Sequence, residues 1–359
     1  MSSSRDTVDE TFLVNFNHDC TSLTVGSECG FKMFALTSVD HSLKRIYCNY
    51  AERIRLVERH FNSSLVVFVS LDAPRTLKIL HVKKQTIICT YSYPNPILAV
   101  KLAQSRLVVC LMERLYVHDL CSMNVLYTIR DTVPNETGLI ALTSGSDQSY
   151  LAYPGSTTEG EVQIFDAINL CTKRQIDAHE SPLSAIAFNR AGTAIATASE
   201  KGTVIRMFSV NDGSKLFEFR RGLQRHVAIT SLTFSVCSDY LCCSSNTETV
   251  HIFKLKQTTS EDEQYDEDSW MGYIGRTVTE YLSQTLPSAV TDVFTQDRAF
   301  SRAVLPVAGL STSSVVTTIQ NVLRLLVASQ DGYLYVFQIP LEGGECLLYQ
   351  KYDLRSLMK

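Results

Sequence analysis

The segment 183–208, LSAIAFNRAGTAIATASEKGTVIRMF, contains three short β-like runs separated by two turns. The first run, 183–188, is followed by a turn with Gly192, and the second leads into a tight turn at Gly202. The third run ends at Phe208. Short strands at this density, with glycine in the turns between them, predict antiparallel β-structure.

The position of Phe208 recurs along the chain, each time after an apolar residue, and we call its occupant the marker residue. The marker residues are Phe34, His81, His118, Phe165, Phe208, Phe253 and Phe337. Their spacings are 47, 37, 47, 43, 45 and 84 residues. Steps of this size match the period of roughly 40–45 residues of four-stranded propeller blades. The sequence therefore predicts an all-β, seven-bladed β-propeller of WD40-like repeats, a single domain over residues 1–359.

The last spacing equals one blade plus an insertion of about forty residues, given the blade period. The sequence places this insertion at 257–297, after the sixth marker. We expect four strands for the seventh blade: Ala299–Leu305, Leu323–Ala328, Tyr333–Ile339 and Cys346–Gln350. Closure of the ring then needs no N-terminal strand, although Phe12–Phe16 could still pair there.

The insertion has two parts. Residues 261–268 contain six carboxylates, and like charges at this density stay solvated. In 269–286, apolar residues fall at steps of three and four, which predicts one apolar face of a helix that ends near Pro287. Three interpretations are open from these residues: a helix packed on the propeller, a helix at a membrane interface, or a helix in a partner's groove.

The composition excludes several classes of protein. The net charge is −4, so bulk attraction to nucleic acid is not expected. Eleven cysteines without a C-x-x-C pair predict neither zinc nor structural disulfides and indicate a reducing compartment. The polar start, residues 1–10, is not expected to be a signal peptide, and no apolar run reaches the 18 residues that span a bilayer.

Two adjacent arginines lie between β-like runs, in Phe219-Arg220-Arg221-Gly222. Successive strand side chains point to opposite faces, so the two guanidinium groups cannot easily share one site. Each guanidinium is a planar fork that matches phosphate. The pair therefore suggests two anion sites flanking one strand; the alternative is a solvated turn.

These residues and their context resemble the PROPPIN family, and within it the animal WIPI members. The similarity runs from about Phe16 to Cys346, and the segments that carry it are Phe219–Gly222, Ala198–Arg206, Ser244–Leu255, Leu151–Gly155 and Gly343–Cys346. The resemblance implies a propeller that binds phosphatidylinositol 3-phosphate and phosphatidylinositol 3,5-bisphosphate in two pockets on blades five and six.

The resemblance also assigns residues to both pockets. The first pocket would use His179, Thr197, Ser199, Gly202, Thr203, Arg206 and Arg220. The second would use Arg221, Gly222, Ser245, Thr249 and His251. Hydroxyls, a histidine and an arginine fork are the donors that a multiply charged inositol phosphate requires.

Two further contacts follow from the same resemblance. The insertion would dip into the bilayer, which selects the interfacial helix for its second part, through Trp270, Met271, Tyr273, Ile274 and Val278. Arg106 would contact a coiled-coil autophagy scaffold of the conjugation machinery, in a groove between blades two and three. The chain is then expected to be cytoplasmic and peripheral on phagophore and endosomal membranes, where it would scaffold autophagosome formation by recruiting lipidation machinery.

The sequence also bears on two other classes of function, an enzyme and a protein-binding adaptor. An enzyme is not expected, because the sequence has no nucleophile elbow, phosphate-binding glycine loop or metal-ligand spacing; we therefore expect no catalytic residues, metal or cofactor. The alternative function is a purely protein-binding WD40 adaptor whose arginines read acidic peptides.

Overall fold

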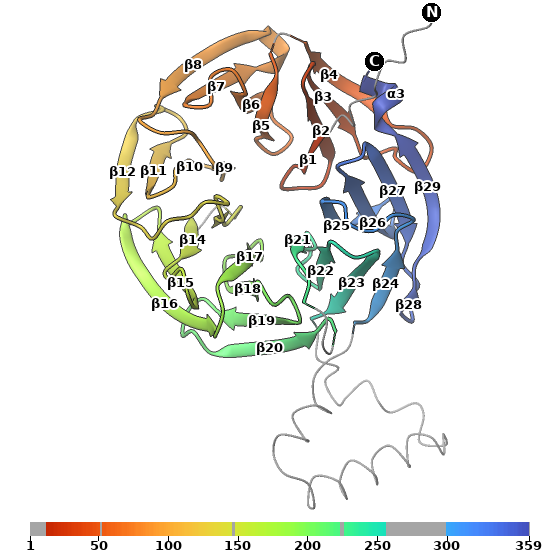
Figure 1. Cartoon of the computed structure of the whole chain (residues 1–359). Coiled ribbons are helices and arrows are strands. Elements are labelled where there is room, and N and C mark those ends of the chain that lie inside the picture. The colour runs from red at the N-terminus through yellow and green to blue at the C-terminus, as the bar shows by residue number, and fades with distance from the viewer. Residues whose placement is uncertain (1–11, 51, 146–147, 223–225, 256–298, 359) are drawn as a thin grey trace, which may run out of the picture.

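The computed structural model describes residues 12–50, 52–145, 148–222, 226–255 and 299–358. Figure 1 shows the strands as seven blades arranged in a ring, with the described ends of the chain close together beside blades one and seven. Each blade is an antiparallel meander, and the chain passes from one blade to the next around the ring. The predicted seven-bladed β-propeller is confirmed.

Blades one to four each contain four strands. Blade one consists of β1 (Leu13–Phe16), β2 (Ser22–Ser27), β3 (Gly30–Ala35) and β4 (Lys44–Asn49). Blade two consists of β5 (Ile54–Arg59), β6 (Leu65–Ser70), β7 (Thr76–His81) and β8 (Thr86–Ser92), with the short 3-10 helix η1 (Val82–Lys84) before its last strand. Blade three consists of β9 (Ala99–Leu102), β10 (Arg106–Cys110), β11 (Arg114–Asp119) and β12 (Val125–Arg130). Blade four consists of β13 (Ala141–Leu142), β14 (Tyr150–Pro154), β15 (Gly160–Asp166) and β16 (Cys171–His179).

The remaining blades follow the same order. Blade five consists of β17 (Leu183–Phe188), β18 (Ala194–Ser199), β19 (Val204–Ser209) and β20 (Lys215–Arg220). Blade six consists of β21 (Ile229–Phe234), β22 (Tyr240–Ser245), β23 (Thr249–Lys254) and β24 (Ser301–Val304), with the two-residue β28 (Gly344–Glu345) added parallel at its edge. Blade seven consists of β25 (Thr312–Ile319), β26 (Val322–Ser329), β27 (Tyr333–Gln338) and β29 (Leu347–Asp353), followed by the helix α3 (Leu354–Met358).

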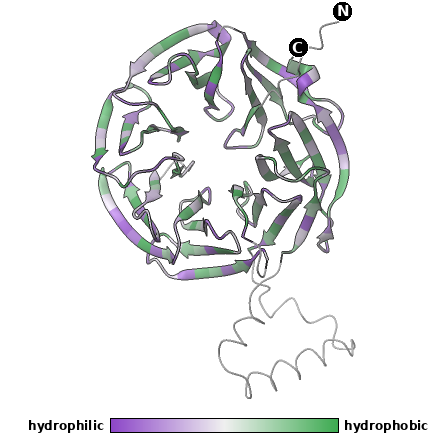
Figure 2. Ribbon diagram, viewed as in Figure 1, coloured by the Kyte–Doolittle hydropathy of each residue, from purple (hydrophilic) through white to green (hydrophobic). Residues whose placement is uncertain are grey.

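All seven marker residues lie in the third strand of their blade. The marker phenylalanines are buried among residues of their own and adjacent blades; Phe253, for example, belongs to the cluster that also holds Phe219 of blade five. Figure 2 shows continuous hydrophobic stretches within the blades, whereas the outermost strands mix hydrophilic and hydrophobic residues. The repeat found in the sequence is thus the packing repeat of the blades.

One strand assignment was wrong. Ala299–Leu305 was predicted as a strand of the seventh blade, but β24 is the fourth strand of blade six, where it pairs with β23. The first strand of blade seven is β25, which the sequence analysis missed. The insertion, predicted as a helix-prone loop in blade six, therefore falls between β23 and β24, two hydrogen-bonded strands of that blade; its residues, including the acidic run 261–268 and the segment 269–286, lie outside the described residues.

The ring closes between blades seven and one without exchange of a strand. β1 pairs with β2 of its own blade, and all four strands of blade seven come from the C-terminal part of the chain. The backbone N–H of Phe12 donates to the carbonyl of Gln330 at 2.9 Å, and Phe12 is buried with Leu334 and Leu354. Side-chain packing and a few polar contacts thus hold this junction.

Candidate functional site at the junction of blades five and six

The arginine pair lies where the chain leaves blade five. Arg220 is the last residue of β20, opposite Val204 of β19, and the backbone N–H of Arg221 donates to the carbonyl of Thr203 at 3.0 Å. The preceding Phe219 is buried and stacks on Phe253 of blade six, with ring centroids 4.7 Å apart. This packing fixes the strand end, so the backbone that carries both arginines is rigidly placed.

Three of the residues predicted for the first pocket, His179, Thr197 and Arg206, form a connected polar network between blades four and five. His179 ends β16, and its Nε2 lies 2.9 Å from the Thr197 hydroxyl on β18. That hydroxyl donates to the carbonyl of Arg206, which lies opposite Thr197 on β19. The Arg206 guanidinium in turn donates through Nη1 to the carbonyl of Ala178 at 2.8 Å.

Two charged residues that the sequence analysis did not select complete this network. Glu218 accepts a hydrogen bond from Arg206 Nε at 2.9 Å and another from Lys215 at 3.0 Å. Burial raises the pKa of Glu218, but these two cations outweigh it, so the pKa lies below its usual value. Burial, followed by the charge of Arg206, lowers the pKa of His179 to about 4, and the histidine is neutral at pH 7.

Arg220 differs from Arg206 in its contacts. Its Nε is buried and has no hydrogen-bond partner among the described residues. Buried donors are almost always paired in native proteins, so an exception of this kind requires an explanation. A bound anion would supply the missing acceptor, because a guanidinium carries both the charge and the donors that phosphate oxygens require.

A glycine turn brings the two pockets together. Gly202 has a φ of +62°, a conformation that favours glycine, and its N–H donates to the carbonyl of Ser199 at 2.9 Å. A Cβ at this position would lie 2.1 Å from the carbonyl oxygen of Val227. The carbonyl of Gly202 accepts a hydrogen bond from Arg221 Nε at 3.1 Å. This close approach of blades five and six explains why glycine occupies the position between Ser199 and Thr203.

The second predicted pocket surrounds Arg221. Its Nη1 donates to the hydroxyls of Ser245, at 3.1 Å, and Thr247, at 3.3 Å. Burial first, and then the charges of Arg221 and Arg302, lower the pKa of His251 to about 4. His251 lies opposite Arg302 in the pairing of β23 with β24, and Thr249 begins β23. Arg221 thus turns to blade six, whereas the polar network of Arg206 extends to blade four.

Thr247 and Arg302 were missed by the sequence analysis. Thr247 lies two residues from both Ser245 and Thr249, so the spacing of hydroxyls gave a signal for it. Arg302 follows the insertion and sits on a strand that was given to the wrong blade, so no local pattern connected it with His251. Gly222, also predicted for this pocket, is half-buried, with no atom within 4 Å of the position of an added Cβ.

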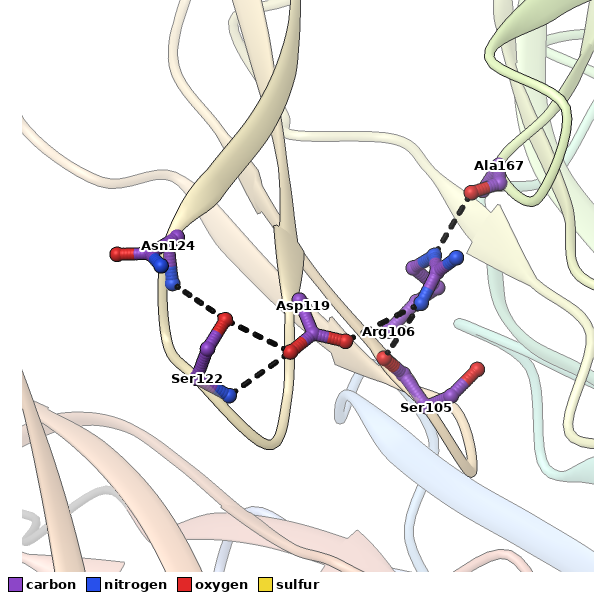
Figure 3. A network of polar contacts seen from close by, with 6 residues as sticks. All are labelled: Ser105, Arg106, Asp119, Ser122, Asn124 and Ala167. Atoms are coloured by element: carbon purple, nitrogen blue, oxygen red, sulfur yellow. Dashed lines mark hydrogen bonds and ion pairs between the residues drawn. The ribbon is translucent and has the colours of Figure 1, made fainter.

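Arg106, the predicted partner contact, begins β10 and faces blade four. Its Nε donates to the carbonyl of Ala167 at 2.8 Å, and its Nη1 contacts the Ser105 carbonyl and Asp119 (Figure 3). Hydrogen bonds from Ser122 lower the pKa of Asp119, and Arg106 lowers it further. The side chain therefore lies at the junction of blades three and four rather than in a groove between blades two and three, and its partner role stays a prediction.

The residues predicted to enter the membrane belong to the insertion and lie outside the described residues. They are Trp270, Met271, Tyr273, Ile274 and Val278. Within the described ranges, no helix is long and apolar enough to cross a bilayer. The same part of the chain holds no group of three or more His, Cys, Asp or Glu residues arranged to bind a metal.

The fold and this junction define a class of protein. The family model PROPPIN matches residues 11–355, and the chain belongs to the PROPPIN family. It is 54% identical to WD repeat domain phosphoinositide-interacting protein 2 of Gallus gallus, over 96% of this chain and 79% of that protein. It is 37% identical to Autophagy-related protein 18 of Caenorhabditis elegans, over 98% of this chain and 88% of the relative. A solved complex of KlAtg21 with the coiled coil of AgAtg16 matches in fold, with a TM-score of 0.75 at 23% identity, over 96% of this chain and 99% of the other.

Proposed function

We propose that this protein is a non-enzymatic phosphoinositide effector, with two headgroup pockets on either side of the Arg220–Arg221 backbone. The observation that carries the proposal is the buried Arg220 Nε, which has no hydrogen-bond partner among the described residues. The names of its relatives support a phosphoinositide ligand. The ligands we propose are phosphatidylinositol 3-phosphate and phosphatidylinositol 3,5-bisphosphate.

In the first pocket, Arg220 supplies the main charge to the headgroup phosphate. Ser199 and Thr203 offer hydroxyls at the turn between β18 and β19, and His179 with Thr197 forms the polar wall of the pocket. Arg206 contributes positive charge that Glu218 partly compensates. A phosphate bound here removes the cost of the unsatisfied guanidinium nitrogen, since buried unpaired donors cost about 1–3 kcal/mol.

In the second pocket, Arg221 is preorganised by the hydroxyls of Ser245 and Thr247. His251 and Arg302 lie beside it on blade six, and Thr249 is the first residue of the same strand as His251. Two pockets on one rigid rim bind one membrane together, and the second headgroup is captured at a high effective concentration. Avidity then exceeds the affinity of either pocket by roughly 10²–10⁴.

The membrane role has two further parts in this proposal. The inserted segment, through Trp270, Met271, Tyr273, Ile274 and Val278, enters the bilayer interface as a third contact. At the membrane the protein scaffolds autophagosome formation by recruiting a coiled-coil component of the lipidation machinery, and Arg106 is the proposed contact residue. Support for the role in autophagy is the family membership together with the naming of a relative as autophagy-related.

Flotation with vesicles tests the lipid ligand. Vesicles with phosphatidylinositol 3-phosphate or the 3,5-bisphosphate are expected to float the protein, and vesicles with unphosphorylated phosphatidylinositol are not. The Arg220→Ala/Arg221→Ala variant is expected to remain at the bottom. The matched control is Arg114→Ala/Arg130→Ala, which removes the same charge from two exposed arginines that pair across strands of blade three.

The same assay separates the proposal from a protein-binding adaptor. Equal flotation with neutral vesicles, or none with any phosphoinositide, contradicts the lipid function. Saturable binding of acidic peptides that needs both arginines would then favour the adaptor. Insertion is followed through Trp270, the single tryptophan. We expect its fluorescence to shift to the blue on vesicles with phosphatidylinositol 3-phosphate, and an unchanged spectrum contradicts insertion.

A further inference from the structure

A cavity lies at the axis of the ring, at the ends of the innermost strands of the blades. Its volume is about 240 Å³, and its polar lining includes His18, Glu58, Arg59, Lys101 and Arg190. One buried water needs only about 10–15 Å³ of such space. The cavity thus has room for a ligand considerably larger than a single water molecule.

The cavity is separate from the two pockets proposed for phosphoinositides. His18, Arg59 and Arg190 lie at or just after the C-terminal ends of the first strands β1, β5 and β17, whereas Arg220 ends the fourth strand β20. In an antiparallel four-stranded meander, the first and fourth strands end at opposite edges of the sheet. The cavity therefore opens near the face of the propeller opposite Arg220.

Arg59 lacks one of the partners that its guanidinium requires. The residue is 8% exposed; its Nε donates to the carbonyl of Ser63 at 3.1 Å, and its Nη2 to the side chain of Asn62 at 3.0 Å. Its third nitrogen, Nη1, is buried without a hydrogen-bond partner among the described residues. A buried arginine nitrogen of this kind indicates an acceptor in the cavity.

The charges around the cavity favour an anion. Of the residues that line it, three are basic, Arg59, Lys101 and Arg190, and one is acidic, Glu58. Glu58 is already paired with Lys101 at 2.6 Å. His18 stacks on Phe61, and its Nδ1 is a second buried polar atom without a partner in the described part of the chain. Asp19, next to the cavity, accepts hydrogen bonds from Asn17 and Thr21.

We propose that this cavity binds one small oxyanion of the phosphate class, held by Arg59 and Arg190, with His18 as a further hydrogen-bonding group. The ligand is free phosphate or the phosphate group of a small soluble molecule. The site is independent of the membrane, since none of its residues belongs to the arginine pair of blades five and six.

Calorimetric titration with inorganic phosphate tests this site in the full-length Arg220→Ala/Arg221→Ala variant, at constant ionic strength against chloride. We expect saturable binding of one phosphate per chain. Arg59→Gln is expected to weaken binding at least about tenfold, the effect of losing charge-assisted hydrogen bonds. Arg190→Ala removes an exposed cation and is expected to weaken binding by a smaller factor, whereas the exposed Arg114→Ala of blade three leaves it unchanged.

Three results would overturn the proposal. These are the absence of saturable phosphate binding in the double variant, binding that neither Arg59→Gln nor Arg190→Ala weakens, and equal weakening by Arg114→Ala. Because Arg59 is buried, circular dichroism and thermal unfolding must show that Arg59→Gln is folded. If Arg59→Gln does not fold, the variant Arg190→Ala, at an exposed position, tests the phosphate site by itself.

Discussion

Two arginines at blade junctions of this propeller differ in their hydrogen bonding. At the junction of blades seven and one, Arg324 donates through Nε and Nη2 to both oxygens of Asp40, at 3.1 and 2.9 Å. Its Nη1 lies 3.4 Å from Gln338, and its guanidinium lies over the ring of Tyr349, 4.0 Å from the centroid. Both side chains of the ion pair are 5% exposed. At the junction of blades five and six, Arg220 retains a buried nitrogen without a partner in the described chain.

The two arginines therefore differ in what their hydrogen bonds do: those of Arg324 join two blades, whereas the Nε of Arg220 is left for the ligand proposed above. The ring closes without strand exchange, so a buried, fully bonded ion pair joins two blades that share no backbone sheet. The arginine pair follows Phe219, whose stacking on Phe253 already joins blades five and six. The hydrogen bonds of Arg221 to Gly202, Ser245 and Thr247 add to this junction, whereas the Nε of Arg220 makes no hydrogen bond among the described residues.

The largest effect is expected for Asp40, which pairs with Arg324 across blades seven and one. Asp40→Ala leaves the buried Arg324 without its carboxylate, and loss of one partner of a buried pair costs about 3–5 kcal/mol. We expect a decrease of this size in the free energy of unfolding, measured in urea at pH 7. Arg53→Ala removes a half-exposed arginine that contacts Glu28 and Asp72, and should change stability by less than about 1 kcal/mol. Equal losses in both variants would show that the Arg324 pair is no more important than a surface contact.

The single variants Arg220→Ala and Arg221→Ala test the arginine pair at the junction of blades five and six. Each removes one proposed pocket, so the protein loses avidity and binds phosphoinositide vesicles about 10²-fold more weakly or worse. We expect the free energy of unfolding to change by less than about 1 kcal/mol in Arg220→Ala, because one buried donor without a partner is removed. Vesicle sedimentation and urea unfolding measure the two effects. A large loss of stability in Arg220→Ala would make this arginine a structural residue like Arg324.

The sequence predicted the fold through its period, and its motif pointed to the junction of blades five and six as the candidate site. The marker spacing located each blade, because each marker phenylalanine on a third strand packs against a neighbouring blade. The period failed where the insertion interrupts blade six, since β24 resumes the sheet more than forty residues after β23 ends. Consequently Arg302, on β24, could not be related to His251 by spacing.

The sequence pattern also could not predict which side chains pair with each other. Glu218 is two residues before Arg220, yet its bond to Arg206 depends on the register of β19 with β20. The direction of Arg106 toward Ala167 depends on how blades three and four pack. Local motifs identify which residue types are present; the arrangement of blades determines which of them meet.

Two glycines test how closely the pockets depend on backbone geometry. In Gly202→Ala, the added Cβ meets the Val227 carbonyl at 2.1 Å and the residue keeps a positive φ, so we expect a loss of more than about 1 kcal/mol of stability. Displacement of the turn should also weaken vesicle binding. Gly222→Ala is the matched control, with open space around the new Cβ and an expected change within about 0.5 kcal/mol. If both variants behave alike, the turn at Gly202 does not determine the approach of the two blades.

Acid pH is expected to have opposite effects on stability and on vesicle binding, through His179 at the end of β16 and His251 on β23. The pKa values of His179 and His251 are each lowered to about 4 from an ordinary value near 6.5. Between these values the unfolded chain binds protons that the folded chain does not, so stability falls as the pH falls from 6.5 toward 4. The expected loss between pH 7 and pH 6 is about 0.7 kcal/mol per histidine. Urea unfolding at the two pH values measures it as the difference between the unmodified protein and the His179→Gln/His251→Gln variant, because burial also lowers the pKa of His18, His60 and His118.

A headgroup phosphate beside these histidines raises their pKa, so the complex takes up protons that the free protein does not. Binding to phosphoinositide vesicles should therefore tighten over the pH range in which the free protein becomes less stable. The neutral glutamines of the double variant abolish this linkage while leaving Arg220 and Arg221 in place. Vesicle affinity that is independent of pH in the unmodified protein would mean that the phosphate is not close to either histidine. The pockets would then be formed by the arginines and the hydroxyls of the turns alone.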